Sequence, residues 1–365
     1  MKKCICFALL IGIIILSGCS LPASQNSNDV VDKVKEPLPD NKKEDSTKNE
    51  TLNGNNVHNT TKGEKADEIK NPAGKGTLPV TLYYQDGEGF IVPVTIGFER
   101  QEGIARAAVE SLVDNSLTRE ELEYYGIFPV LPQGTEILGI NIKQGTAVID
   151  FNNKLLNYED GTAERNIISA VVYTLTEFKT VDSVRILVNG RSPGRLKFGT
   201  EISGTLGREN VLVNSERLNL KEGMRKIDIY LTKVINDKRI CILPLSIEFS
   251  GPEGDDVPAR IVELLVMEHS GGKLHSELPS GTKLLQSDHS ANTLILDFNG
   301  EIKKYGGTAR EDGIIKQILY SMKQIKGVER VRILIEGKPD YLPEGTDLTN
   351  EMAIPREINL IEELR

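Results

Sequence analysis

Two Asp-Phe-Asn triplets are the polar motifs of this chain whose residue types and spacing best suit chemistry. They contain Asp150 with Asn152 and Asp297 with Asn299, and each follows an alternating apolar run. A carboxylate at a strand end is a candidate general base for hydrolysis. Alternatively, the Asp and Asn side chains close the strand end by bonding neighbouring backbone amides. Because no His, Cys or second carboxylate accompanies the triplet in both copies, the structural interpretation is favoured.

Three histidines, His269, His275 and His289, form a second candidate site. A zinc site needs three or four converging ligands that are themselves held by hydrogen bonds. The spacing of these histidines fits no helix-borne pair, and the matching positions of the first half, where they can be aligned, are the apolar Phe128 and Ile142. We therefore expect surface histidines, no metal site and no cofactor.

Glycine-threonine steps precede two helical patterns, at Gly161-Thr162 and at Gly307-Thr308. Such steps suggest anion binding at a helix N-terminus, but helix capping by the threonines is the simpler expectation. The sequence contains no phosphate loop, nucleophile elbow or HExxH motif. We predict no catalytic residues and a protein that is not an enzyme.

The N-terminus carries a different chemistry, centred on the thiol of Cys19. A basic start is followed by a short apolar run from Cys4 to Leu16, and then by Leu16, Ser17, Gly18 and Cys19. The run is too short to span a bilayer, which argues against an uncleaved anchor and predicts a signal peptide over residues 1–18. Leu-Ser-Gly-Cys resembles the bacterial lipobox, in which the cysteine receives a diacylglycerol. This pattern predicts a lipoprotein, with acyl chains such as palmitate holding Cys19 to the extracytoplasmic face of the cell membrane.

After processing and lipidation, Cys241 is the one cysteine left in the exported body. It lies in the apolar run 239–243, so we expect a small buried hydrophobe and no intramolecular disulfide. Residues 19–77 are mostly polar and charged. Such a composition cannot bury enough surface to offset the ordering entropy, and it predicts a disordered, lipid-anchored linker. The net charge of −9 argues against a nucleic-acid partner.

The folded part contains one long pattern twice, at a spacing of 147 residues. LPQGTEIL, AVIDFNNKLLNY and VRILVNGR, which begin at Leu131, return from Leu278 onward as LPSGTKLL, TLILDFNGEIKKY and VRILIEGK. A match of this length indicates tandem duplication. We predict one domain over residues 78–213, a polar connector over 214–225 and a second domain over 226–362.

Each repeat combines paired strands with two helical patterns and lacks regular βαβ alternation, which predicts the α+β class. In the first repeat, the helices are expected over residues 105–113 and 162–178, and the longer one has an apolar stripe that returns in the second repeat. We expect a mostly antiparallel sheet in each repeat, with two helices covering one face. Pro93 cannot donate to a ladder, so its strand should be an edge or bulged there.

The first repeat contains an insertion, residues 114–130, whose counterpart in the second repeat is shorter and polar. It includes Tyr124, Tyr125, Ile127 and Phe128. Because aromatic residues are favoured interface anchors, one hypothesis is that these four residues contact a partner. The alternative is that the run folds back over its own domain.

The motifs V-E-x-L-V, at residues 109–113 and 262–266, and L-P-x-G-T before each hairpin resemble those of the GerMN domain family. The resemblance covers everything after Gly76, and the lipobox and polar linker resemble those of the sporulation lipoproteins that carry such domains. It implies a fold similar to the ring-building domains of secretion systems. It also implies a non-catalytic role in assembling or stabilising the SpoIIIA–SpoIIQ complex, from the mother-cell-derived membrane facing the intermembrane space.

Three functional hypotheses remain at this point. The leading one is a structural scaffold that acts through protein–protein contacts, with SpoIIQ- or SpoIIIA-type partners and a homo-oligomer as a further option. The second is a peptidoglycan- or envelope-binding accessory protein in spore germination or cortex formation, although the scarcity of aromatic residues weighs against sugar stacking. The third is a cell-wall hydrolase with an unrecognised site.

Overall fold

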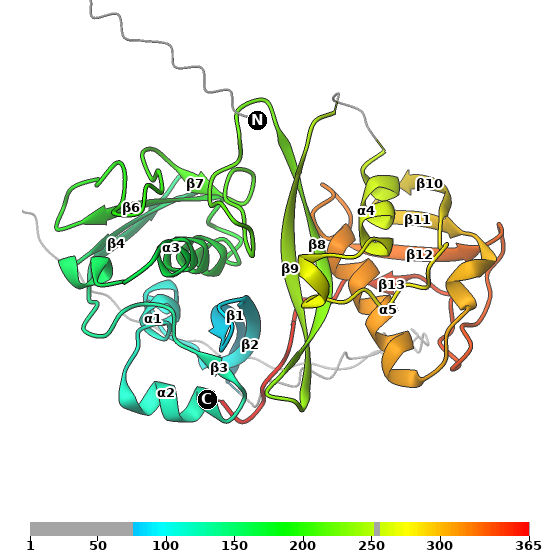
Figure 1. The fold of residues 1–365 in the computed structure, drawn as a ribbon, viewed down its shortest axis with the longest axis horizontal. Coiled ribbons are helices and arrows are strands. Elements are labelled where there is room, and N and C mark those ends of the chain that lie inside the picture. The colour runs from blue at the N-terminus through cyan, green and yellow to red at the C-terminus, as the bar shows by residue number, and fades with distance from the viewer. Residues whose placement is uncertain (1–75, 252–255, 365) are drawn as a thin grey trace, which may run out of the picture. The chain divides into compact units, whose positions relative to one another are not determined.

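The structure is a computed structural model that describes residues 76–251 and 256–364 (Figure 1). The predicted signal peptide and lipobox, with Leu16, Ser17, Gly18 and Cys19, lie outside the described residues, as does the predicted linker up to residue 75. Within the described ranges, no helix is long and apolar enough to cross a membrane.

The first repeat begins with the hairpin β1 (Thr77–Asp86) and β2 (Ile91–Glu99), to which β3 adds on the other side of β1. β4, β5, β6 and β7 form a separate four-stranded sheet in that order. The remaining elements of this repeat are α1 (Ile104–Glu110), α2 (Ser116–Glu123), β3 (Ile127–Phe128), β4 (Ile137–Lys143), β5 (Thr146–Phe151), a 3-10 turn (Asn153–Leu156), α3 (Gly161–Leu175), β6 (Ser183–Val188) and β7 (Leu206–Gly207).

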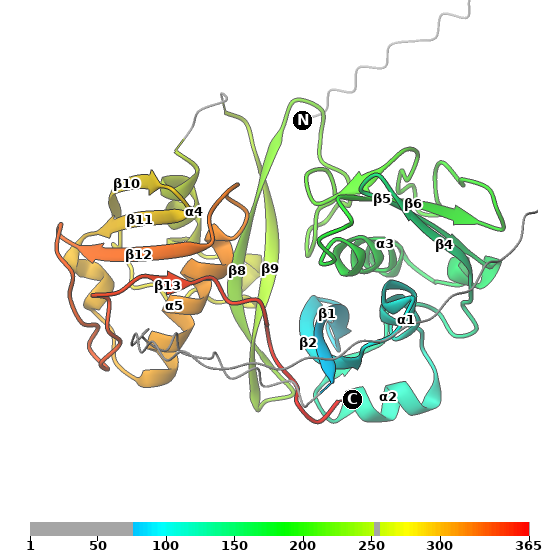
Figure 2. The same ribbon diagram turned by 180° about the vertical axis from the view of Figure 1, so that it is seen from behind.

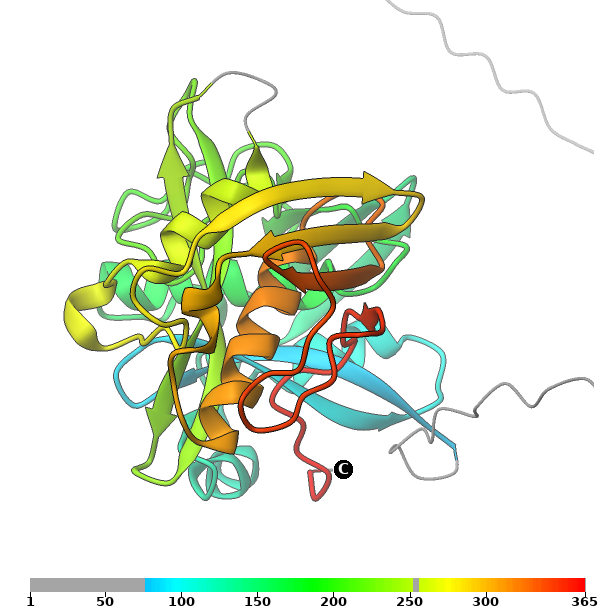
Figure 3. The same ribbon diagram turned by 90° about the vertical axis from the view of Figure 1, so that its right-hand side faces the viewer.

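The second repeat, which faces the viewer in Figure 3, follows the same order, and its described residues contain no counterparts of α2 and β3. Its sheets are the hairpin β8–β9 and a four-stranded sheet of order β10-β11-β12-β13. Its elements are β8 (Arg225–Ile235), β9 (Arg239–Phe249), α4 (Val257–Val266), a 3-10 turn (Ser270–Gly272), β10 (Leu284–Ser290), β11 (Thr293–Phe298), a 3-10 turn (Gly300–Lys303), α5 (Thr308–Met322), β12 (Arg330–Ile335) and β13 (Met352–Ala353).

The α+β class is confirmed, and most strand pairs are antiparallel as predicted. Two details differ from the prediction. β5 pairs with β6 in parallel, and β11 with β12, because a long helix carries the chain across the sheet between them. The strands of each repeat also divide into two sheets. The reason lies in α3, which is buried without interruption from Asn166 to Leu175 and therefore needs cover on more than one side.

Several local predictions hold. Pro93 lies in β2, which is an edge of its sheet. Cys241 is a free thiol, 1% exposed, in β9. The expected threonine caps are wrong, because Asp160 caps α3 by accepting hydrogen bonds from the amides of Thr162 and Ala163, and the residue before α5 is Gly307, which makes no side-chain cap.

Each long helix carries a buried glutamate that binds a distant loop. Glu164 accepts hydrogen bonds from the amides of Phe198 (2.7 Å) and Thr200 (2.9 Å) and from the hydroxyl of Tyr158 (2.7 Å). Burial would raise the pKa of Glu164, but these donors outweigh burial and lower it. Glu311 does the same in the second repeat, with the amides of Glu344 and Thr346 and the hydroxyl of Tyr305. These carboxylates fix the loops that follow β6 and β12.

We expect Glu164→Gln to lower the free energy of unfolding by about 1–3 kcal/mol at pH 7, because the amide cannot replace the charged acceptor. The lowered pKa of Glu164 means that its contribution is present above the unfolded-state pKa of about 4.3 and is lost as the pH falls through the folded-state value. The difference between variant and wild type should therefore shrink in acid. Urea denaturation at pH 7 and in acid, below the folded-state pKa, measures this difference, with the exposed Glu159→Gln as control. A pH-independent difference would contradict this account.

Candidate functional site at the junction of the two repeats

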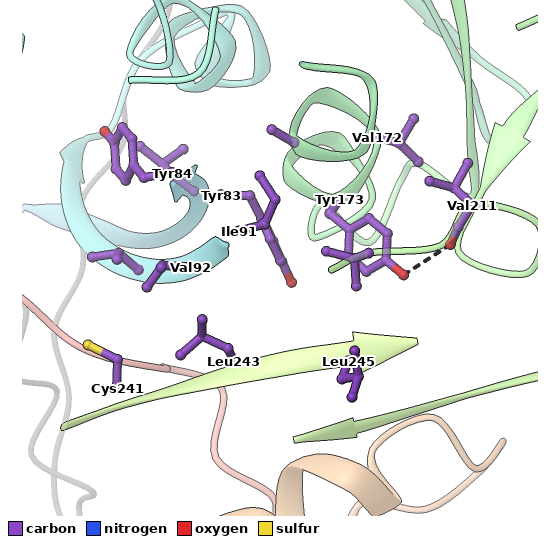
Figure 4. Packing of buried hydrophobic residues seen from close by; sticks show 14 of the residues in the cluster. Tyr83, Tyr84, Ile91, Val92, Val172, Tyr173, Val211, Cys241, Leu243 and Leu245 are labelled. Atoms are coloured by element: carbon purple, nitrogen blue, oxygen red, sulfur yellow. Dashed lines mark hydrogen bonds between the residues drawn. The ribbon is translucent and has the colours of Figure 1, made fainter. Parts of the chain in front are cut away.

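The two repeats share one hydrophobic core, and the hairpin β8–β9 lies between them (Figure 1). Leu243 and Leu245 of β9 lie opposite Ile91 and Val92 of β2 and Tyr173 of α3 (Figure 4). All five side chains are buried. The junction is therefore a packed interior, and the predicted domains do not hang apart on their connector.

The segment after each repeat crosses to the second strand of the other repeat. At the end of the first repeat, Val213 exchanges hydrogen bonds with Ser246 of β9: Ser246 N donates to the Val213 carbonyl (3.0 Å) and Val213 N donates to Ser246 Oγ (2.9 Å). At the end of the second repeat, Ile358 makes the same pair with Thr95 of β2, at 2.9 and 2.8 Å. The C-terminal segment thus runs from the second repeat back to the first (Figure 2).

Asn214 joins the two edge strands directly. Its Oδ1 accepts from the amide of Ile91 (2.6 Å), and its Nδ2 donates to the carbonyls of Ile91 (2.9 Å) and Pro244 (2.8 Å). Its φ of 54° is left-handed, a conformation that asparagine tolerates better than most residues. One side chain therefore satisfies backbone groups of β2 and β9 together.

Asn359 makes the equivalent arrangement at the end of the second repeat, with a φ of 48°. Its Oδ1 accepts from the amide of Ile242 (2.9 Å), and its Nδ2 donates to the carbonyls of Ile242 (2.8 Å) and Pro93 (2.7 Å). Each asparagine thus pairs with its own repeat's second strand and reaches the proline of the other. The junction has an approximate two-fold symmetry that follows from the duplication.

Charge breaks this symmetry. Lys233 of β8 is 6% exposed, and its Nζ lies 2.9 Å from Oδ2 of Asp86 and 2.7 Å from Oε1 of Glu88. Lys273 adds a further contact to Glu88 at 2.9 Å. Burial would lower the pKa of Lys233, but the two carboxylates outweigh burial and raise it. Asp86 and Lys233 occupy equivalent positions of the two repeats, 147 residues apart.

A second, partly buried ion-pair cluster crosses the junction at Glu177. The Glu177 carboxylate binds Arg208 (2.6 Å) and the hydroxyl of Tyr83 (2.8 Å), and Lys323 of the second repeat lies 3.5 Å away. Burial alone would raise the pKa of Glu177, but Arg208 and Lys323 lower it to about 2. In these ion pairs the acid belongs to the first repeat and the lysine to the second. Pairing two copies of one repeat in this way would place Asp86 against Asp86, or Lys233 against Lys233.

The predicted partner-contact residues differ in their exposure to solvent. Tyr124 is 81% exposed. Ile127 is 1% exposed and belongs to the core, so its assignment as a partner contact is wrong, because β3 pairs with β1 and turns this side chain inward. Phe128 is half-buried opposite Gln85. Folding back over the domain accounts for these last two residues.

Tyr125 has a role that neither sequence hypothesis contained. The guanidinium of Arg239 in β9 lies 5.6 Å from its ring centroid, and its hydroxyl donates to Glu363 over 3.5 Å. The next residue, Gly126, has a φ of 72°, and a Cβ there would lie 2.7 Å from that of Asn236. The insertion therefore packs against the second repeat. Only the long-range contacts reveal this, since nothing in its composition points to Arg239.

The other candidate groups have structural tasks. Oδ1 of Asp150 accepts from the amide of Gly190 (2.9 Å), and Oδ1 of Asp297 accepts from that of Gly337 (2.8 Å), as the backbone interpretation predicts. The asparagines of both triplets donate to loop carbonyls. His269 contacts the carbonyl of Leu264. Across the part of the chain that the structure describes, no group of three or more His, Cys, Asp or Glu side chains could hold a metal ion.

We expect Asn214→Ala to destabilise the protein by about 1–3 kcal/mol, because the amide of Ile91 and the carbonyl of Pro244 lose their partner. Thermal unfolding and limited proteolysis of the connector measure the effect. Asn236→Ala is the matched control, since Asn236 also has a left-handed φ of 52° but an exposed side chain. Equal losses in the two variants would assign the whole effect to backbone strain.

A double-mutant cycle tests the buried pair of Asp86 and Lys233. Asp86→Lys and Lys233→Asp should each cost about 3–5 kcal/mol, because each leaves like charges buried together. The double exchange should recover part of the combined loss, since it restores opposite charges. Chemical denaturation of the four proteins gives the coupling energy. A coupling near zero would show that the two side chains do not act on each other.

Comparison with known proteins places both repeats in one family. The family model Germane, described as sporulation and spore germination, matches residues 81–193 and 233–341, which is one match in each repeat and more than half of the chain. Over 361 residues, the chain is 27% identical to the spore germination protein GerM of Bacillus subtilis (strain 168), covering 96% of this chain and 95% of that protein.

A solved structure agrees with the fold. The tandem GerMN domains of the sporulation protein GerM from Bacillus subtilis match with a TM-score of 0.67 and 26% identity, over 78% of this chain and 100% of theirs. The first GerMN domain of that protein, solved alone, is 35% identical over 36% of this chain and 98% of its own length, with a TM-score of 0.34. The chain therefore belongs to the Germane family of sporulation and spore germination proteins and carries tandem GerMN domains.

Proposed function

We propose that the protein is a lipid-anchored, non-catalytic scaffold of sporulating cells that helps assemble or stabilise the SpoIIIA–SpoIIQ complex between mother cell and forespore. The observation that carries the proposal is the packed junction between the two repeats. The two domains form one rigid unit, because they share a hydrophobic core, the hydrogen bonds of Asn214 and Asn359, and the buried ion pair of Asp86 and Lys233. A body of this kind holds its two outer faces at a fixed spacing, which suits a protein that positions partners.

The proposal also includes a non-catalytic role, because the candidate catalytic groups have structural roles. The carboxylates that could serve as bases, those of Asp150 and Asp297, are engaged by backbone amides, and those of Glu164 and Glu311 are engaged by loop amides and tyrosines. The thiol of Cys241 is buried, and burial raises its pKa. Groups committed in this way stabilise the fold and are poor bases or nucleophiles.

The anchor rests on Leu16, Ser17, Gly18 and Cys19. Lipidation of the Cys19 thiol would hold the protein to the extracytoplasmic face of the cell membrane, which in sporulation is the mother-cell-derived membrane facing the intermembrane space. The polar stretch that follows Cys19 gives the folded domains reach from that surface.

Cross-linking in sporulating cells tests the proposal. We expect SpoIIQ- or SpoIIIA-type proteins to be recovered with the detergent-extracted protein and identified by mass spectrometry. Cys19→Ala should abolish metabolic labelling with a palmitate analogue and reduce this recovery, because the protein loses its membrane. Glu159→Gln, an exposed change in the first repeat, is the control. Recovery of cell-wall enzymes alone, or equal recovery from growing cells, would favour an envelope-binding accessory protein instead.

A further inference from the structure

A groove of about 630 Å³ opens in the first repeat beside α2. Apolar side chains from β1, β2, α2 and the C-terminal segment line it, and the chain's C-terminal end lies beside α2 in both views of Figures 1 and 2. The residues that matter for the argument are Tyr84, Ile96, Phe98, Leu122 and Leu364, with Glu99 and Glu121 as the charged residues of the lining.

Tyr84 lines the groove, and although the residue is only 2% exposed, its hydroxyl oxygen is not among the fully buried, unpartnered polar atoms of the described residues. Figure 4 shows the side chain of Tyr84 pointing to the opposite side of β1 from that of Tyr83. Burial raises the pKa of Tyr84, and the nearby Glu121 carboxylate raises it further, so this hydroxyl remains a neutral donor. Because this hydroxyl is accessible from the groove, it can donate a hydrogen bond to a ligand that enters there.

α2 presents a second feature next to the groove. Leu117 and Tyr124 are 73% and 81% exposed, and both lie on the helical stripe that includes Glu121. Residues at these spacings are neighbours on a helix surface. An acid flanked by an exposed leucine and an exposed tyrosine has the composition of a binding surface, because aromatic anchors dominate interface energetics.

The charge of this surface is negative. Glu99 and Glu121 are exposed, and no lysine or arginine lines the groove. The arginine of α2, Arg119, is already paired with Asp114. The acids of the groove therefore have no basic neighbour in its lining, and a basic ligand would complement them.

The helix beside this groove, α2, has no counterpart in the described part of the second repeat. Between α4 and β10 the second repeat has only the short 3-10 turn Ser270–Gly272 where the first has α2 and β3. Duplication produced two similar domains, so an added helix that shapes a groove in one of them marks a specialised face.

We propose that the groove and the α2 stripe bind a basic segment of a partner protein, with an apolar side chain entering above Tyr84 and a lysine or arginine beside Glu121. A backbone carbonyl of the segment would accept from the Tyr84 hydroxyl. The inference deepens the proposed scaffold function and rests on it for the biological setting, while the binding chemistry can be tested without that setting.

The test uses the full-length protein in neutral detergent and a fluorescein-labelled synthetic peptide that alternates leucine with lysine. We expect saturable binding by fluorescence anisotropy above an empty-micelle blank, weakening with added salt. A peptide with glutamate for lysine should not bind. Glu121→Lys should weaken binding by about tenfold or more and Tyr124→Ala several-fold. Melting curves of each variant confirm folding, since both side chains are exposed.

Matched controls separate this site from general acidity. Glu120→Lys makes the same charge change one residue away on α2, outside the groove lining, and Tyr341→Ala removes a 55% exposed tyrosine from the second repeat. Both should bind as the wild type does. Equal weakening by Glu120→Lys and Glu121→Lys, or undiminished binding to Glu121→Lys, would overturn the proposal. The proposal would also be overturned if the protein formed dimers without the peptide and Tyr124→Ala dissociated them, because the groove would then bind a second copy of this chain.

Cells distinguish failure of the inference from failure of the proposed function. If Glu121→Lys leaves recovery of the sporulation complex unchanged, the groove is not the contact and the scaffold function stands. If the peptide binds as expected but wild-type protein captures no complex component, the surface is real and the proposed function falls.

Discussion

Two edge strands with unpaired backbone groups, β2 and β9, decide how the rest of the molecule is arranged. An open strand edge accepts any chain that can reach it. Here the segment after each repeat reaches the other repeat's strand, and Asn214 and Asn359 complete the pairing with their side-chain amides. An amide both donates and accepts, so one asparagine serves two strands at once. The apolar faces of both hairpins are covered as a consequence.

The same junction makes the two domains non-equivalent. Duplication alone would leave two interchangeable domains, but Asp86 and Lys233 differ at one equivalent buried position and form an ion pair across it. A like-charged pair at that position would be penalised in a low-dielectric interior. The first repeat also carries the added helix α2, so the tandem has two distinct faces on one body. A protein that organises partners needs such distinct, fixed faces.

The polar groups that suggested chemistry serve the architecture instead. Asp150 and Asp297 hold the turn after the neighbouring parallel strand, and Glu164 and Glu311 hold a loop more than thirty residues away in sequence. A buried carboxylate is retained when several amides donate to it, because those bonds offset the cost of desolvation. The duplication preserved these groups in both copies for the fold.

The sequence by itself determined the tandem repeat, the α+β class and the position of each long helix, because apolar periodicity and turn residues are local signals. It also placed Cys241 in a buried strand. Only the tertiary structure decided that each repeat holds two sheets, that Ile358 returns to the first repeat and that Tyr125 meets Arg239. The last two contacts join residues more than one hundred positions apart, and no periodicity within a segment records which distant edge it will pair with.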